Sequence, residues 1–160
     1  MKIIHTGDVH IGSALKSLPS EKARLRRAEL LDGFFSLCAY AKAENVGAVL
    51  MAGDLFDSNQ VSSQTVQDVF SSIRSASPVP FFYVSGNHDN VVALPTLLPD
   101  NFHVFSQFEL CSYNRGRLIF SLVPVVFGIE VIESGIQGCL FCHIHGCKYR
   151  VSVLVSIFFV

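Results

Sequence analysis

The sequence is poor in charged residues and almost neutral. Of its 160 residues 16% are charged, and the formal net charge is −1. This balance gives no overall attraction to nucleic acid or to an anionic membrane, so partners must be recognised by local groups. Half of the residues are hydrophobic, which excludes a disordered chain and favours one globular domain with a substantial core.

Long apolar runs and an export signal are also missing. The apolar segment 151–160 is too short to cross a bilayer as a helix, and Pro124 and Glu130 interrupt the one at 118–132. We expect strands in both segments and no membrane contact. No secretory signal follows Met1, so the five cysteines are expected to be reduced thiols in the cytoplasm.

The first half of the chain alternates between strand-like and helix-like segments. Apolar runs predict three strands, at 2–5, 48–52 and 80–84. Apolar residues at helical spacing predict a helix at 21–44 and a second that begins at Ser62 or Ser63. This order is typical of a parallel α/β sheet with right-handed crossovers, in which ligands gather beyond the carboxyl ends of the strands.

Three short motifs stand where these strands would end. They are Asp8-Val9-His10, Gly53-Asp54-Leu55-Phe56-Asp57 and Gly86-Asn87-His88-Asp89. Each alone is common in turns or helix caps. Together they would bring carboxylates, imidazoles and an amide to one edge of the sheet, where a cation is needed to neutralise the charge. The set therefore indicates a metal-dependent hydrolase.

Four residues of these motifs have side chains that bind cations well, and they predict a centre with two divalent ions. Asp8 and His10, two residues apart, would point to the same side of an extended chain and hold one ion. Asp54 would bridge two ions, and Asn87 would offer its carbonyl oxygen to the second. A mixed oxygen and nitrogen ligand set suits manganese, iron or zinc. Two such ions clamp a phosphate ester and generate hydroxide at neutral pH.

Three further motif residues would support this chemistry. Asp57 and Asp89 are better placed to orient the ligands than to bind an ion. His88, which is flanked by Asp89, suits an imidazole that stabilises charge at the phosphate or protonates the leaving oxygen. The predicted catalytic residues are therefore His88 and Asp89.

The same motifs resemble the first three signatures of the calcineurin-like metallophosphoesterase superfamily. The longer strings at 5–12 and 52–57, with Arg27 and Glu29, are most similar to the SbcD-type DNA repair exonucleases. The resemblance covers about residues 1–110. It implies a four-layer αββα sandwich, a dinuclear centre that prefers manganese, hydrolysis of phosphodiester bonds at DNA ends and an ATPase partner of the SbcC type. By matching positions it implies four ligands and one catalytic histidine, namely Asp8, His10, Asp54, Asn87 and His88.

The second half departs from the pattern of this family. Its members supply further histidine ligands from a strand that ends in His-Gly and from a later Gly-His-x-His string, whereas this chain offers only His143-Ile144-His145-Gly146. We predict His145 as the ligand, with His143 as the alternative. One element cannot fill both roles, so the centre would lack at least one or two ligands and its activity would be impaired. We expect one domain over 1–160, well matched over 1–110 and divergent or truncated over 111–160, without a capping domain.

Two further patterns leave alternatives open. A basic cluster beside the first motif is either a solvated helix face or a contact for DNA phosphates; it comprises Lys16, Lys22, Arg24, Arg26 and Arg27. Arg24 and Arg27 are the candidate substrate-binding residues. The string Cys139–His143 matches the C-x-x-C-H motif of covalent haem attachment, which needs an exported chain. Together with His145 and Cys147 the same residues would suit a zinc site. Buried, inert thiols are the favoured interpretation.

The predicted function is metal-dependent hydrolysis of phosphodiester bonds in DNA. A competing prediction keeps the fold but assigns phosphomonoesters or cyclic nucleotides as substrates. Another is a non-catalytic fragment whose dinuclear site is incomplete.

Overall fold

The computed structural model describes residues 2–57, 61–85 and 94–105, together with the backbone of four strands beyond them. The chain divides into two compact units, Met1–Val104 and Phe105–Val160, and each is described by itself. Within the described residues, no helix combines the length and the hydropathy that a membrane span needs.

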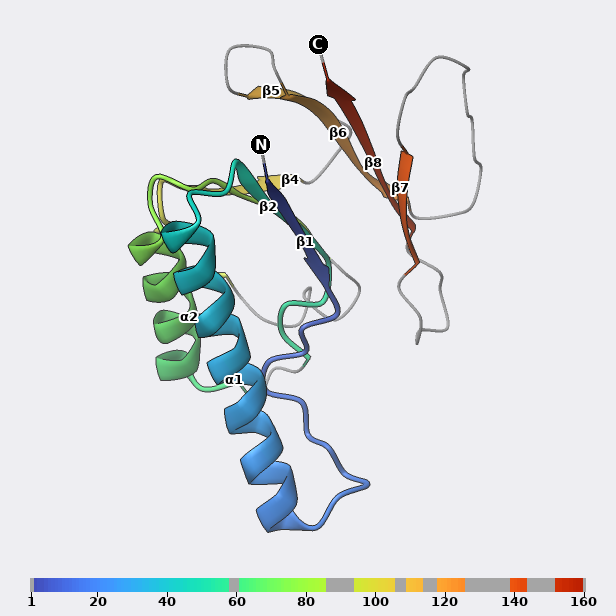
Figure 1. The fold of residues 1–160 in the computed structure, drawn as a ribbon. Coiled ribbons are helices and arrows are strands. Elements are labelled where there is room, and N and C mark those ends of the chain that lie inside the picture. The colour runs from blue at the N-terminus through green and yellow to red at the C-terminus, as the bar shows by residue number, and fades with distance from the viewer. Residues whose placement is uncertain are drawn as a thin grey trace. The chain divides into compact units, whose positions relative to one another are not determined.

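The first unit is a four-stranded sheet with two helices on one face (Figure 1). Its elements are β1 (Ile3–Gly7), α1 (Ser20–Ala43), β2 (Ala48–Ala52), α2 (Ser63–Ser75), β3 (Phe81–Val84) and β4 (Phe102–Phe105). The strand order is β1-β2-β3-β4, and both β1 and β3 run parallel to β2. Gly7 pairs with Ala52, which pairs with Val84, so these three strands end at the same edge. The predicted alternation of strands and helices is confirmed.

The core of this unit lies between the helices and the sheet face that they cover. Alternate residues of β2 and β3 point into it, namely Val49, Met51, Phe81 and Tyr83. The helices contribute Phe34, Cys38 and Ala41 from α1 and Val66, Val69, Phe70 and Ile73 from α2. Burying an apolar side chain of the larger kinds stabilises the fold by about 1.5–3 kcal/mol. The apolar faces that the sequence predicts for both helices therefore hold them on the sheet.

The start of α2 is fixed by a local signal in the sequence. The Ser62 hydroxyl accepts a hydrogen bond from the backbone N–H of Thr65 at 3.0 Å, which satisfies one of the donors that a helix start leaves free. This is one of the two caps that the sequence predicts. Because the cap sets where α2 begins, it also fixes the position of Val61 and Thr65, which line a cavity beside α1.

The second unit is an antiparallel sheet. Its strands are β5 (Glu109–Tyr113), β6 (Leu118–Val125), β7 (Cys139–His143) and β8 (Ser152–Phe159). Their order is β5-β6-β8-β7, and all three described pairings are antiparallel. β6 and β8 fall within the two apolar segments that the sequence predicts to be strands, so this prediction is confirmed for their described residues. The string that resembles a haem-attachment motif forms β7.

Candidate metal centre

The loops that follow β1 and β2 run side by side beyond the sheet. Four backbone hydrogen bonds join them: Asp8 N to Gly53 O at 3.3 Å, His10 N to Asp54 O at 2.9 Å, Ile11 N to Leu55 O at 2.9 Å and Asp57 N to Ile11 O at 3.1 Å. The first two motifs are thus held against each other by the main chain. This pairing continues the parallel register of the two strands, in which Gly7 lies opposite Ala52.

Asp8, His10 and Asp54 form a group that can hold a metal ion. One ligand atom from each of the three lies within 4.8 Å of the others. Asp54 is only 1% exposed, while Asp8 and His10 each keep about a third of their side-chain surface in contact with solvent. Two carboxylates at this separation repel each other by about 3.5 kcal/mol at an effective dielectric constant of about 20. A divalent cation would convert that repulsion into attraction, and the donor set of two oxygens and one nitrogen suits such an ion.

The carboxylate of Asp57 contacts the imidazole of His10 at Nδ1. Its Oδ1 is 3.2 Å from His10 Nδ1, while His10 Nε2 is 3.5 Å from Asp8 Oδ1. A carboxylate on one ring nitrogen fixes the tautomer and the ring orientation, and leaves the other nitrogen for a metal. The geometry therefore favours Nε2 as the donor atom of His10, on the side where the Asp8 carboxylate lies.

The backbone at the ligands is in an unusual conformation. Asp8, His10 and Asp54 have φ angles of 52°, 52° and 50°, in the left-handed region that non-glycine residues rarely adopt. Asp8 and His10 therefore do not lie on an extended chain, and the expectation that they share a side for that reason is wrong. The backbone N–H groups of Asp8 and His10 donate to the loop after β2, and these hydrogen bonds bring the ligands of the two loops together. Strain of this kind clusters at functional sites.

Glycine is required at the end of β1. A Cβ atom at Gly7 would lie 2.8 Å from the carbonyl oxygen of Ala52, which is closer than real Cβ contacts allow. The close approach of β1 and β2 just before the motifs therefore depends on this residue. The sequence marks the position only as a turn.

The remaining predicted site residues lie outside the described part of the chain. These are Asn87, His88, Asp89 and His145. The motif at 86–89 follows β3, whose last residue, Val84, lies opposite Ala52. His143, the alternative to His145, is the last residue of β7.

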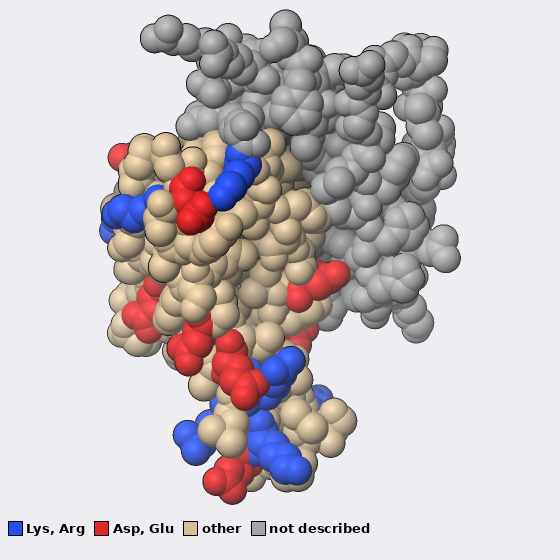
Figure 2. Space-filling view, in the orientation of Figure 1, with Lys and Arg blue, Asp and Glu red and all other residues tan. Residues whose placement is uncertain are grey.

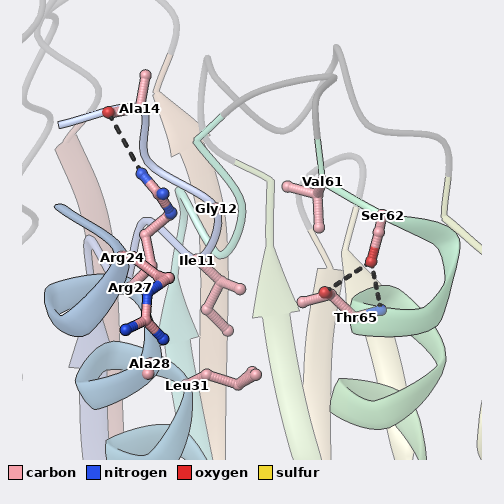
Figure 3. A pocket seen from close by; sticks show the side chains of 10 residues that line it. All are labelled: Ile11, Gly12, Ala14, Arg24, Arg27, Ala28, Leu31, Val61, Ser62 and Thr65. Atoms are coloured by element: carbon pink, nitrogen blue, oxygen red, sulfur yellow. Dashed lines mark hydrogen bonds between the residues drawn. The ribbon is translucent and has the colours of Figure 1, made fainter. Parts of the chain in front are cut away.

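The two candidate substrate-binding arginines line a cavity of about 530 Å³ (Figure 3). Arg24 is exposed and Arg27 is half-buried. Figure 2 shows lysine and arginine side chains gathered over the start of α1, with acidic side chains among them. Part of the predicted basic cluster is neutralised, since Arg26 Nη1 lies 2.7 Å from Glu29 Oε2.

Burial shifts the pKa of two further titratable side chains, Cys38 and His5. Cys38 is buried between the helices and the sheet, and burial raises the pKa of its thiol to about 11. Burial also lowers the pKa of His5, in β1. Neither belongs to the group that can hold a metal among the described residues.

Comparison with known proteins extends these observations. The family model described as calcineurin-like phosphoesterase matches residues 1–155. The DNA double-strand break repair protein Mre11 of Halobacterium salinarum is 34% identical over 55% of this chain and 22% of its own length. The SbcD component of the nuclease SbcCD of Bacillus subtilis is 31% identical over 62% of this chain and 25% of its own. Mre11 of Saccharolobus solfataricus is 29% identical over 82% of this chain and 32% of its own. The chain thus spans about a quarter to a third of the length of these relatives.

Proposed function

Because the chain belongs to the calcineurin-like phosphoesterase family, we propose that it hydrolyses phosphodiester bonds at DNA ends with two divalent cations. The observation that carries this proposal is the group of Asp8, His10 and Asp54, whose ligand atoms lie within 4.8 Å of one another. Similarity to relatives named as a DNA double-strand break repair protein and as a nuclease supports DNA as the substrate.

The described residues have distinct roles in this proposal. Asp8 and His10 hold one cation, and Asp57 orients the imidazole through Nδ1, 3.2 Å from its carboxylate. Asp54, which is only 1% exposed, would contribute its carboxylate to the second cation as well. Manganese is the proposed metal, and iron and zinc accept the same donors. When bound, the ions neutralise charge on the phosphate and lower the pKa of water to near neutrality.

Four residues complete the proposed site. Asn87 and His145 supply the further ligands, and His88, supported by Asp89, stabilises the phosphate charge or protonates the leaving oxygen. The family pattern and the place of the 86–89 motif after β3 support these roles.

The proposal extends to the surroundings of the site. An ATPase partner of the SbcC type and a cytoplasmic location are part of it, as is a single αββα domain built from both units. The match of one family model to residues 1–155 supports a single domain, because that range crosses the boundary between the units.

Titration with Mn²⁺ and degradation of linear DNA test this function. Calorimetry should show two sites per chain, and Asp54→Asn should lose both tight binding and DNA degradation. Asp32→Asn, on an exposed position of α1, removes the same charge and should keep both. One site or none, with no turnover of any phosphoester, would contradict the proposal. Turnover of p-nitrophenyl phosphate without turnover of DNA would establish a phosphomonoesterase instead.

A further inference from the structure

A cavity of about 530 Å³ adjoins the proposed metal centre along the chain. Its walls come from the loop after β1, from the first half of α1 and from the start of α2 (Figure 3). Ile11, which lines it, directly follows the ligand His10 and donates its backbone N–H to Leu55, which directly follows the ligand Asp54. On the loop after β1, the lining of the cavity thus begins one residue beyond His10 of the metal group.

One wall of the cavity is cationic. Arg24 and Arg27 reach it from α1, and neither takes part in an ion pair among the described residues. Arg27 Nη1 donates one hydrogen bond, at 3.5 Å, to the carbonyl oxygen of Ala14, which leaves most of the five donors of a guanidinium available. No described residue that lines the cavity is acidic. Two positive charges thus border this space, and none of the described lining residues supplies a carboxylate.

The facing wall offers hydroxyl groups. Ser62 and Thr65 line it from the start of α2 (Figure 3), and their hydroxyl oxygens lie 2.8 Å apart. Between the two helices the lining is apolar, with Ile11, Leu31 and Val61. A volume of this size is typical of sites for small molecules that combine an apolar lining with a few placed polar groups.

We propose that this cavity binds a phosphate group of the DNA, together with its attached nucleoside. This phosphate is not the one that is hydrolysed. Guanidinium groups recognise phosphate oxygens in a fixed fork geometry, which assigns the phosphate to Arg24 and Arg27. The sugar and base lie against the apolar lining. This inference rests on the proposed function and deepens it, because a second phosphate site selects a polynucleotide over a phosphomonoester or a cyclic nucleotide.

Binding of a labelled ten-nucleotide thymidine strand in EDTA tests the inference without any metal. The test variant is Arg24→Gln with Arg27→Gln. The matched control is Lys22→Gln with Arg26→Gln, which removes the same charge from the same helix at exposed positions that do not line the cavity. Fluorescence anisotropy between 50 and 200 mM salt gives both affinity and salt dependence. Circular dichroism checks that each variant is folded.

The test variant should bind about tenfold more weakly at 100 mM salt, and its plot of log affinity against log salt should be shallower by about 0.7, the value for one phosphate contact on a single strand. The control should stay within twofold of the original chain. Equal weakening of both variants would mean that the helix acts only through its general charge, and it would overturn the cavity site. So would absence of binding by the original chain.

The outcome is separable from that of the proposed function. If neither the original chain nor any variant hydrolyses DNA with Mn²⁺, but the two double variants still differ in DNA binding, the hydrolytic function fails and the phosphate site stands. If DNA is hydrolysed and the double variants bind equally, the hydrolytic function stands and the phosphate site is overturned.

Discussion

Replacing Asp54 by asparagine should separate metal binding from folding. The substitution keeps the size of the side chain and removes one of two negative charges that lie within 4.8 Å in the proposed centre. In the absence of metal those charges repel each other by about 3.5 kcal/mol at an effective dielectric constant of about 20. We therefore expect Asp54→Asn to be at least as stable as the original chain in EDTA, and more stable by up to about 3 kcal/mol.

The effect should reverse when metal is added. Mn²⁺ at one hundred times its dissociation constant stabilises a protein that binds it only when folded by about 2.7 kcal/mol. For a chain of this length that corresponds to a rise in Tm of about 5–10 °C. The original chain should show this rise and Asp54→Asn should not. Thermal unfolding followed by circular dichroism, in EDTA and in a series of Mn²⁺ concentrations, measures both effects.

Asp32→Asn is the control for this experiment. Asp32 lies on α1, is exposed and is not one of the three residues that can hold a metal, so its substitution should leave the Mn²⁺ shift intact. A full Mn²⁺ shift in Asp54→Asn would refute the assignment of the ligands. Strong destabilisation of Asp54→Asn in EDTA would refute the argument from repulsion, because the carboxylate would then be stabilising the metal-free fold.

Three other changes test neighbouring parts of the structure. Asp57→Asn should lower Mn²⁺ affinity by about 10–100-fold in calorimetry, because it weakens the group that orients His10; unchanged affinity would contradict that role. Gly12→Ala should lower the free energy of unfolding in urea by about 1–3 kcal/mol, since Gly12 has a φ of 85° and a Cβ there would lie 2.3 Å from Val61 Cγ2; an unchanged midpoint would show that Val61 can move away. The pKa of Cys38 is raised to about 11, so the folded chain keeps this proton between about pH 9 and 11 while the unfolded chain loses it. Stability should therefore fall by about 2 kcal/mol between pH 8 and 10.5, and a Cys38→Ala variant measured by urea unfolding should lack this part of the loss.

The elements of the first unit could be predicted because their signals are local. β2 occupies the predicted residues 48–52. A short, continuous apolar run that ends at a glycine is typical of a parallel strand covered on both faces. α2 begins after Ser62 because that hydroxyl caps it. α1 spans Ser20–Ala43, one residue earlier at each end than predicted. Helix ends of this kind are set by which backbone groups find partners, and apolar spacing does not encode that.

The shape of the candidate site could not be predicted in the same way. The left-handed conformations of Asp8 and His10 depend on hydrogen bonds to a loop that is distant in the sequence. Aspartate and histidine tolerate this conformation better than most residues, but nothing local requires it. The contact between Asp57 and His10 arises in the same way. The sequence thus predicts the chemistry of the two motifs, and the pairing of their loops determines how the side chains meet.

The paired loops also explain how a site with two repelling carboxylates can form before any metal binds. A backbone hydrogen bond contributes about 1 kcal/mol net, so the four bonds between the loops contribute about 4 kcal/mol. That is close to the repulsion of about 3.5 kcal/mol between Asp8 and Asp54. The main chain can therefore hold the ligands together without a cation. Metal binding would then add stability to a centre that is already arranged, and its free energy would not be consumed in folding the loops.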